Sequence, residues 1–382
     1  MPDLWAETIR DPAVLEPLRA EWDALAVAAG RPYAQPAWML AWWEHCRPAD
    51  SALRTVVVRD GDQLVGIAPF HAQGSRYRML GAEFASNVEP LALAGAEAEV
   101  AAAIAAELAG DGAARAIELE LVGDSPCWPS LLRGAWPGAA EPWQRLDGDV
   151  VAPFVEFEEG VDYGSWLQSK SSKFRYWVRQ GRRKLEDAGA SFRVSTAATL
   201  ERDVRELLRL HRLRHEDAGS ILVDAGGPER MLIAAGGELI ASGRFKLVCL
   251  DIDDRIVSAQ LMLAAGAEAG GWNGGFDPAY GKLSPALHTV IHGLELAIAD
   301  GRRRLDLGPG AQPYKQRLAT GERRLTSSVL VPRGSGYAST RLGLALRAAP
   351  RAVRRRLPSR VTEGLRKGSR RVPAGAGRLS SD

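Results

Sequence analysis

Cysteine is scarce in this chain of 382 residues, which contains three. Cys46, Cys127 and Cys249 are odd in number and far apart, so they predict neither a disulfide framework nor a cysteine metal cluster, and they are typical of a reducing compartment. The chain also lacks a run of 18 uncharged apolar residues and a basic, apolar leader at its start. We therefore expect a cytoplasmic protein without a membrane-spanning helix or a secretory signal.

Charge is unevenly distributed along the chain. Residues 333–382 hold 13 Arg and Lys and 2 acidic residues, a net charge of +11, and since the whole chain carries +2, residues 1–332 carry −9. The leucines and arginines of this tail, interrupted by Pro350 and Pro358, predict two short basic amphipathic helices. We expect the tail to contact anionic lipid peripherally at the inner membrane face. The alternative is a tail that keeps the protein soluble or contacts nucleic acid.

The length of the chain and two similar hairpins favour two similar domains. A chain of 382 residues is longer than a single hydrophobic core usually accommodates. Its content of 46% hydrophobic residues is typical of a globular protein. Residues 52–70 read as strand, turn and strand around Asp60-Gly61. Residues 244–263 repeat this pattern at a constant offset of 192, so that Val57-Val58 aligns with Cys249-Leu250. This predicts a tandem repeat.

The stretch 270–318 has the strongest local signals. Ser284 and Pro285 fit the N-cap and first position of a helix. Apolar residues then recur every three or four positions up to Ile298, and Gly301 ends the helix. Leu305–Leu307 reads as the next strand. The unit is therefore strand, helix and parallel strand, and its helix N-terminus offers unpaired N–H groups to an anion.

Other segments give weaker signals. Helices are expected at 13–29, from Pro36 through Trp43, and at 97–109, 169–185, 200–216 and 229–242, strands at 117–122 and 150–158, and irregular structure at 124–148. Helix 169–185 mixes seven Arg and Lys with Phe174 and Trp177. Such a helix could contact nucleic acid or lipid, but an amphipathic surface helix is the interpretation we favour.

The central stretch suggests a ligand with both amides and phosphates. Where two parallel strands of a mixed sheet separate, their unpaired backbone groups can be completed by an extended ligand acting as a further strand. Glycines on both sides of the helix permit close approach. A pyrophosphate at the helix N-terminus together with an amide-bearing arm along the strands describes coenzyme A.

Several motifs resemble a known family. Ser-Pro-Ala-Leu begins the helix from Ser284, the helix ends in Ala-Asp-Gly at 299–301, and Asp-Leu-Gly-x-Gly-x-x-x-Tyr-Lys follows at 306–315. The chain also carries Ser-Lys-x-Arg at 172–175 before Arg-Arg-Lys-Leu-Glu, and the segment YAQPAWMLAWW from Tyr33. Together they resemble the GNAT-superfamily acyltransferases of the CelD/BcsL, or BioF2-like, type, which are relatives of the FemABX aminoacyltransferases. The similarity covers residues 5–320.

This resemblance implies a fold and a domain division. The expected fold class is α/β (α+β), with two tandem GNAT-like domains that each have a mixed central sheet flanked by helices. The domains span residues 1–160 and 161–332, and the basic tail spans 333–382. The second domain would hold the donor site. The family's usual Ser-Pro-Gly is replaced here by Ser284, Pro285 and Ala286. The sequence motif of the superfamily's pyrophosphate loop is not recognisable at 280–287.

The implied reaction is direct transfer of an acyl group from acyl-CoA, such as acetyl-CoA, to an amine or hydroxyl. The enzyme must orient both reactants, polarise the thioester and take a proton from the nucleophile. Asp306 is the first candidate for the base, with Glu216 or a histidine acting through water as others. Asp306 could equally cap the glycine turn that follows it. Tyr314 is the candidate for protonating the leaving thiolate.

The binding residues implied by the resemblance fall into two sets. The donor set is Lys282, Ser284, Ala286, Leu287 and Lys315. Lys315 would pair with a phosphate or the substrate, and the alternative is a solvated surface charge. The acceptor set is His211, His215, Trp272 and Asn273, for which a strand with one buried ring is the alternative at Trp272 and Asn273. The histidine pairs 211/215 and 288/292 are one turn apart but lack an evident third ligand, so we expect no metal.

The family name suggests a small-molecule or saccharide acceptor in polysaccharide or cell-envelope biosynthesis. Two other functions remain open. A FemABX-like enzyme would use aminoacyl-tRNA, with helix 169–185 contacting the RNA, and in that case alone do we expect a nucleic-acid partner. A catalytically degenerate domain would act as a membrane-associated scaffold in exopolysaccharide assembly and would bind no acyl-CoA.

Overall fold

The computed structural model describes residues 4–138, 140–215, 222 and 226–356. The chain divides into two compact units, Met1–Pro332 and Arg333–Asp382. None of the described helices is long and apolar enough to cross a bilayer. We refer to residues 1–160 as the first half of the larger unit and to residues 161–332 as its second half.

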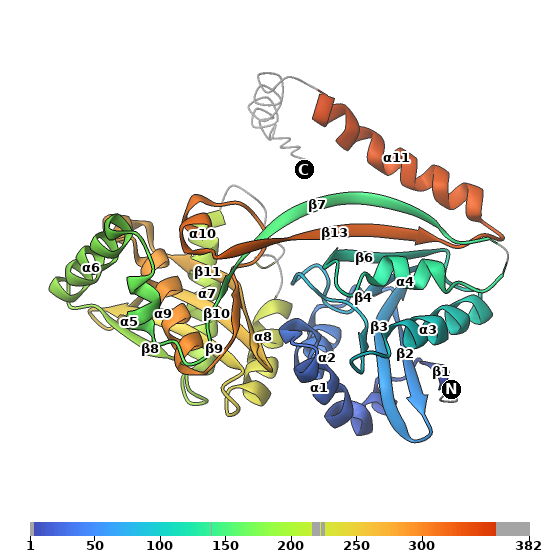
Figure 1. Cartoon of the computed structure of the whole chain (residues 1–382), viewed down its shortest axis with the longest axis horizontal. Helices are drawn as coiled ribbons and strands as arrows, with labels where there is room; N and C mark the ends of the chain where they lie inside the picture. Colours follow the sequence, from blue (N-terminus) through green and yellow to red (C-terminus); the bar gives the residue numbers. More distant parts are fainter. Residues whose placement is uncertain (1–3, 139, 216–221, 223–225, 357–382) are drawn as a thin grey trace, which may run out of the picture. The chain divides into compact units, whose positions relative to one another are not determined.

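The two halves are built from alternating strands and helices (Figure 1). The first half contains β1 (Leu4–Ile9), η1 (Pro12–Leu18), α1 (Arg19–Ala28), η2 (Pro32–Ala34), α2 (Pro36–Cys46), β2 (Ser51–Asp60), β3 (Gln63–Gln73), β4 (Arg76–Met79), β5 (Leu91–Ala92), α3 (Glu97–Asp111), β6 (Ala116–Val122), α4 (Trp128–Gly134) and β7 (Trp143–Glu156). The second half contains α5 (Tyr163–Gln168), α6 (Ser172–Asp187), β8 (Ser191–Val194), α7 (Leu200–His215), α8 (Gly227–Leu239), β9 (Phe245–Ile252), β10 (Arg255–Ala265), β11 (Glu268–Phe276), η3 (Pro278–Leu283), α9 (Pro285–Ala299), β12 (Arg304–Asp306), α10 (Pro313–Leu318) and β13 (Gly321–Val331).

The order of elements from β1 to β7 is repeated from β8 to β13. Each half has a strand, two helices, a hairpin, a fourth strand, a long helix and a strand parallel to the fourth. The hairpins β2–β3 and β9–β10 close on the pairs Asp60↔Gln63 and Ile252↔Arg255, which stand at equivalent positions of the repeat. The predicted fold class, two tandem mixed α/β domains, is confirmed, and the offset seen in the sequence is the offset of the folded hairpins.

The last strand of each half pairs with the other half. Strand β7 pairs with β12, and β13 pairs with β6, while β7 and β13 run antiparallel along each other (Figure 1). The described strands therefore form a single sheet in the order β1-β2-β3-β4-β6-β13-β7-β12-β11-β10-β9-β8, with β5 attached to β3. The exchanged strands β7 and β13 join the two halves through backbone hydrogen bonds, so the sheet is continuous across residue 160. The domain boundary at residue 160 therefore stays a prediction.

Strands β11 and β12 separate after three residue pairs. They pair from Glu268↔Arg304 to Gly270↔Asp306, although β11 continues to Phe276. Beyond this point each strand follows its outer neighbour. Leu307 N–H donates to Pro153 O at 2.9 Å and Gly310 N–H to Val151 O at 2.8 Å, both beside β7, while β11 remains paired with β10. The predicted gap between parallel strands is thus a consequence of competing backbone pairing.

The sheet separates two hydrophobic cores in the second half. Along β10, Leu261 and Leu263 belong to the core that includes α1, α2, α7 and α8, whereas Met262 and Ala264 belong to the core under α9. This alternation follows from the two-residue period of a strand. The gap between β11 and β12 therefore lies between two apolar layers.

Two local predictions are wrong. Residues 124–148, expected to be irregular, contain α4 and the first part of β7, because Pro129 occupies the first turn of a helix and the largely polar residues 144–148 are held by pairing with β13. The tail was expected to form two helices broken at Pro350. It forms α11 (Tyr337–Arg356), which continues through Pro350, and Pro358 lies outside the described residues.

Candidate functional site

A cleft of 340 Å³ lies where β11 and β12 separate. Its walls come from both cores. Tyr33, Phe84 and Trp272 belong to or pack against one core, and Val290, Leu307 and Tyr314 belong to or pack against the other. Residues 271–274 and 308–309 also line the cleft. The cleft therefore passes through the sheet rather than resting on one face of it.

A second cavity of 190 Å³ adjoins this cleft on the α9 side. The two share Gln260, Gly274, Val290 and Tyr314 in their walls. The second cavity extends to Ala286 and Leu287 in the first turn of α9. Together they form a path from the N-terminus of a helix, past the open edge of β11, to the first half of the chain.

The N-terminus of α9 keeps backbone donors available on this path. Ser284 occupies the N-cap position and Pro285 follows it, as predicted, but Ser284 has a left-handed backbone with φ of 52° and its side chain makes no capping hydrogen bond. The N–H groups of Ala286 and Leu287 are therefore not satisfied by that side chain. Such N–H groups and the helix dipole favour an anion.

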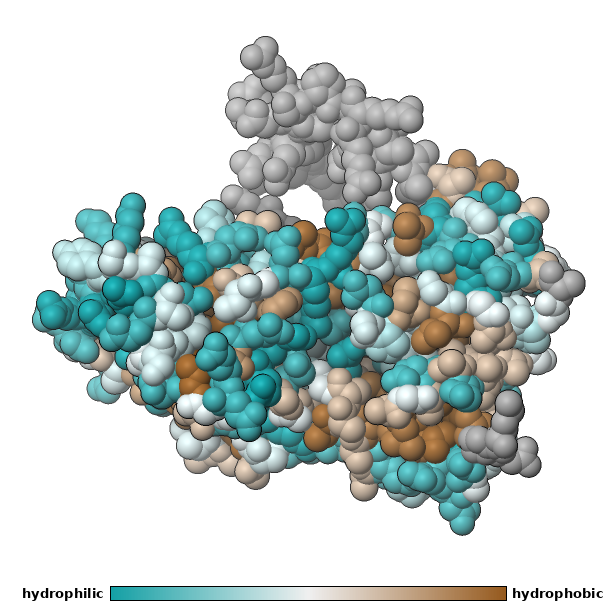
Figure 2. Space-filling model, viewed as in Figure 1, coloured by the Kyte–Doolittle hydropathy of each residue, from teal (hydrophilic) through white to brown (hydrophobic). Residues whose placement is uncertain are grey.

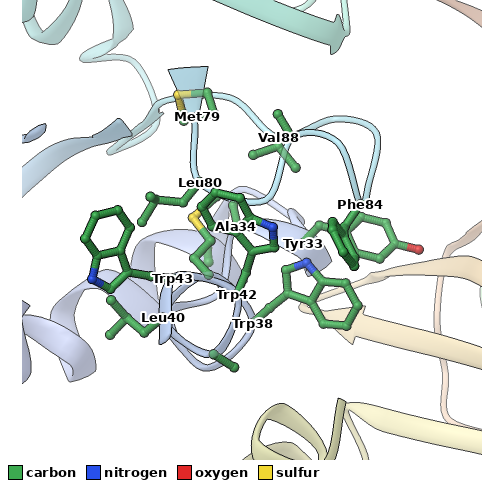
Figure 3. Packing of buried hydrophobic residues seen from close by; sticks show 14 of the residues in the cluster. Tyr33, Ala34, Trp38, Leu40, Trp42, Trp43, Met79, Leu80, Phe84 and Val88 are labelled. Atoms are coloured by element: carbon green, nitrogen blue, oxygen red, sulfur yellow. The ribbon is translucent and has the colours of Figure 1, made fainter. Parts of the chain in front are cut away.

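The first half supplies an aromatic wall. Tyr33 contacts Trp38 edge to face at 5.7 Å between ring centroids, and Trp38 contacts Trp272 of β11 at 5.4 Å. Trp272 Nε1–H donates to the backbone oxygen of Phe84 at 2.5 Å. Figure 3 shows Tyr33, Trp38 and Phe84 gathered at the edge of the packed cluster that holds Trp42 and Trp43. The hydrogen bond from Trp272 fixes the loop 82–86 against β11.

Asp306 and Lys315 fasten the loop after β12. Asp306 Oδ1 accepts from Gly308 N–H at 2.7 Å, and its other oxygen is bonded by Arg323. Lys315 Nζ donates to the oxygens of Gly308 at 3.0 Å and Pro309 at 2.9 Å. Asp306 therefore caps the glycine turn, one of the two predicted roles, and its role as a base stays a prediction. The interpretation of Lys315 as a solvated charge is wrong, since the residue is 6% exposed.

The structure brings some predicted residues together and not others. Trp272, Asn273, Tyr314 and Lys315 line the cleft, and Ala286, Leu287 and Tyr314 line the second cavity. Lys282 in η3 and Ser284 are exposed and belong to neither wall. Glu216 and the side chain of His215 lie outside the described residues. The contribution of all these residues to binding stays a prediction.

One histidine of each pair is buried within the protein. His211 is buried in α7, whose backbone at Leu210 and His211 comes so close to Gly275 that a Cβ there would lie 2.4 Å away. His288 stacks on Trp177 at 5.7 Å, and burial lowers the pKa of His288 to about 4, so its ring is neutral at pH 7. Within the described ranges, no three His, Cys, Asp or Glu side chains are placed to hold a metal ion.

No sequence pattern pointed to the first-half loop after β4. Ala82, Glu83, Phe84, Ala85 and Ser86 line the cleft although they belong to the other half of the chain from β11. Burial raises the pKa of Glu83. Of the first-half residues in the wall, Tyr33 had a signal, because it begins the segment that resembles the family's N-terminal pattern.

Comparison with known proteins agrees with this geometry. Residues 172–316 match the family described as an acetyltransferase (GNAT) domain, a region that includes β11, α9, β12 and most of α10. No curated protein matches the chain. The second half therefore contains a GNAT acetyltransferase domain, and the prediction that the chain is an acyltransferase is confirmed. Membership of the CelD/BcsL type stays a prediction.

Solved structures share most of the fold at low identity. FemX aligns with a TM-score of 0.58 and 12% identity over 82% of this chain and 96% of that chain. L-PGS from Bacillus licheniformis aligns with a TM-score of 0.54 and 12% identity over 86% and 95%. A conserved protein of unknown function from Bacteroides thetaiotaomicron aligns with a TM-score of 0.53 and 12% identity over 85% and 99%. At these identities the similarity establishes the fold alone.

Proposed function

We propose that the chain transfers an acyl group from acyl-CoA, such as acetyl-CoA, to an amine or hydroxyl of a small-molecule or saccharide acceptor. One observation carries the proposal: the pairing of β11 and β12 ends at Gly270↔Asp306, and the cleft passes through the opening and continues to the first turn of α9. The acceptor class follows the family resemblance, which also suggests polysaccharide or envelope biosynthesis.

The path suits the parts of acyl-CoA in order. A pyrophosphate would lie at the N–H groups of Ala286 and Leu287. The amides of the pantetheine arm would pair with the open edge of β11 beyond Gly270 as a further strand. The thioester would then lie in the cleft near Tyr314, which lines both cavities and is the candidate for protonating the leaving thiolate. The acceptor would enter from the first-half side.

Titration calorimetry of the full chain with acetyl-CoA tests the proposal. We expect saturable binding with a dissociation constant on the order of 1 μM to 1 mM, the range of enzyme substrate constants. Desulfo-CoA serves as a control, because the pyrophosphate and pantetheine contacts do not require the thioester. No heat with either compound up to millimolar concentration would contradict the proposal and favour the scaffold function.

A specific observation supports aminoacyl-tRNA as the alternative donor. Lys173, Arg179, Arg183 and Lys184 are exposed on α6, while Val178 and Leu185 are buried. Figure 2 shows that the surface over α6 is largely hydrophilic. A titration with tRNA distinguishes the two donors: binding that weakens steeply with salt, without acetyl-CoA binding, would replace acyl-CoA by aminoacyl-tRNA in the proposal.

We also propose that the tail binds anionic membranes. Leu342 and Leu346, one turn apart on α11, are 61% and 65% exposed, and the tail carries a net charge of +11. Each basic residue near an anionic surface contributes about 1 kcal/mol. In co-sedimentation with phosphatidylglycerol-containing vesicles, the full chain should bind and residues 1–332 should not. Equal binding by both, or equal binding to neutral vesicles, would contradict a tail-mediated electrostatic contact.

A further inference from the structure

The hydroxyl group of Tyr33 lies at the point where β11 and β12 separate. A Cβ added to Gly270 would lie 2.9 Å from this hydroxyl and 3.0 Å from the nearest ring carbon. Gly270 is the last residue of β11 that pairs with β12, opposite Asp306. Tyr33 belongs to η2 of the first half and lines the cleft. Its side chain therefore extends from one half of the chain to the end of the strand pairing in the other.

The ring of Tyr33 is packed, but its hydroxyl is available to a ligand. The ring contacts Trp38 edge to face, and in Figure 3 the Tyr33 oxygen points away from the packed cluster. Within the described ranges, no protein group forms a hydrogen bond with this hydroxyl, and its oxygen is not one of the buried atoms. The hydroxyl therefore offers a hydrogen-bond donor to the cleft that Tyr33 lines.

The backbone on both sides of Tyr33 is held in place by side chains. Trp22 Nε1–H donates to Ala34 O at 2.9 Å. Gln35 Nε2–H donates to Ala264 O of β10 at 3.2 Å, which ties η2 of the first half to the sheet of the second. A donor that is fixed before the ligand arrives stabilises charge without a cost of reorganisation.

The length of the donor path places a thioester beside Tyr33. Between the phosphate oxygen and the sulfur, the pantetheine arm has about 12 bonds, the backbone length of about four residues, or ~13 Å when extended. The cavity at the N-terminus of α9 reaches Gly275 of β11. Counting back that length along the strand from Gly275 reaches Gly271, which lines the cleft and adjoins Gly270. A pyrophosphate at α9 would therefore bring the thioester to the Tyr33 hydroxyl.

We propose that Tyr33 is a catalytic residue that donates a hydrogen bond to the carbonyl oxygen of the bound thioester, so that the first half completes the donor site of the second. This rests on the proposed acyl transfer and deepens it. Tyr33 lies outside residues 172–316, the part of the chain that matches a GNAT domain, so the family match assigns it no role.

The proposed hydrogen bond stabilises the charge that develops during transfer. When the amine or hydroxyl adds to the thioester carbon, the carbon–oxygen double bond becomes single and the oxygen gains a negative charge. The Tyr33 hydroxyl donates to that oxygen and keeps its own proton. The double bond then reforms, the carbon–sulfur bond breaks, and the thiolate leaves with the electron pair. The nucleophile loses one proton and the thiolate gains one, so the protons balance.

The surroundings of Tyr33 keep its hydroxyl protonated. Burial raises the pKa of Tyr33, the negative charge of Asp306 raises it further, and Arg323 opposes the shift. The phenol is therefore neutral at pH 7, which suits a hydrogen-bond donor and not a base. This role differs from that of Tyr314, the candidate for protonating the thiolate, and the two side chains would address different atoms of one thioester.

Infrared spectroscopy of bound acetyl-CoA, labelled with carbon-13 at the thioester carbonyl, tests the proposal without an acceptor. A hydrogen bond lowers the stretching frequency of a carbonyl group. We therefore expect the band in Tyr33→Phe to lie at higher wavenumber than in the unmodified full chain. Tyr176→Phe, which removes an exposed phenol hydroxyl on α6, should leave the band unchanged. An unchanged band in Tyr33→Phe overturns the proposal.

Calorimetry measures the same contact as an affinity. Tyr33→Phe should weaken acetyl-CoA binding by about 5-fold, the factor that one neutral hydrogen bond supplies. Desulfo-CoA has no thioester carbonyl, so the variant and the unmodified chain should bind it equally. If both compounds lose affinity equally, Tyr33 shapes the cleft without contacting the carbonyl, and the proposal is wrong.

Gly270→Ala is a second variant, in which the phenol remains. The added methyl group would lie 2.9 Å from the hydroxyl and displace it from its position at the strand separation. We expect the carbonyl band to move in the same direction as in Tyr33→Phe, and the melting temperature shows that both variants are folded. A band that stays in place in Gly270→Ala contradicts the position assigned to the hydroxyl.

The same measurements separate this inference from the proposed function. If the unmodified chain binds acetyl-CoA and the band does not respond to Tyr33→Phe, the donor site stands and the role of Tyr33 is wrong. If the unmodified chain binds neither acetyl-CoA nor desulfo-CoA, the proposed function fails, and the role of Tyr33 fails with it.

Discussion

Replacing Ala286 by tryptophan is expected to weaken acetyl-CoA binding by at least about 100-fold, or ~2.7 kcal/mol. Ala286 lies in the first turn of α9 and lines the 190 Å³ cavity. An indole there would fill the space in which the donor arm approaches the helix N-terminus, while the half-buried position can carry a larger side chain without displacing the core. Calorimetry with acetyl-CoA measures the loss, and the melting temperature shows that the fold is retained.

Ala299→Trp is the matched control. It places the same side chain on the same helix, but at the exposed last residue, at the opposite end from the cavity. It should bind acetyl-CoA as the unmodified chain does. If Ala286→Trp retains normal affinity, the donor does not use the N-terminus of α9, and the path inferred from the two cavities is incorrect.

Removing the carboxylate of Asp306 is expected to lower the free energy of unfolding by about 3 kcal/mol, the lower end of the cost of breaking a buried ion pair. The Asp306 and Arg323 side chains are 11% and 20% exposed. Asp306→Ala leaves the Arg323 guanidinium without its carboxylate and the Gly308 N–H without an acceptor. Urea denaturation measures the change.

A neighbouring pair provides the control. Asp149 on β7 and Arg324 on β13 are 3.3 Å apart, and their side chains are 55% and 69% exposed. Asp149→Ala should therefore cost less than about 1 kcal/mol. The double variant Asp306→Ala/Arg323→Met should recover more than half of the loss. If Asp306→Ala costs no more than Asp149→Ala, the buried pair does not stabilise the loop.

The conservative variant Asp306→Asn separates the two predicted roles of this residue. The amide oxygen can still accept from Gly308 N–H, but the side chain can no longer take a proton. A general base predicts a lower kcat at unchanged acetyl-CoA affinity. A residue that only holds the loop predicts that rate and donor affinity change together, since Gly308 and Pro309 form part of the cleft.

The glycines of β11 do allow close approach, but at two of them the approaching group is another part of the protein rather than a ligand. By sequence alone, the glycines of β11 are expected to allow close approach of a ligand. In the structure a Cβ at Gly270 would lie 2.9 Å from the Tyr33 hydroxyl, and one at Gly275 would lie 2.4 Å from the α7 backbone. These two glycines admit other parts of the protein, whereas Gly271 and Gly274 line the cleft. Which neighbour approaches a glycine depends on contacts distant in sequence.

The sequence by itself determined the features that local forces control. The turns of both hairpins, the start of α9 at Ser284 and Pro285, and the parallel strand after Gly301 follow from turn chemistry, capping and apolar periodicity within a short stretch of chain. The constant offset between the two hairpins also revealed the repeat, because equivalent hairpins need equivalent local patterns.

Tertiary structure alone decided how the halves complete each other. The exchange of β7 and β13 depends on which strand edges pair between distant parts of the chain, and any polar backbone edge can pair with any other. The same pairing carries Leu307–Gly310 along β7 and away from β11, which opens the cleft. It also brings Glu83 of the first half into the wall of the cleft that β11 of the second half lines. No local pattern encodes these contacts, because they are selected by the packing of the whole sheet.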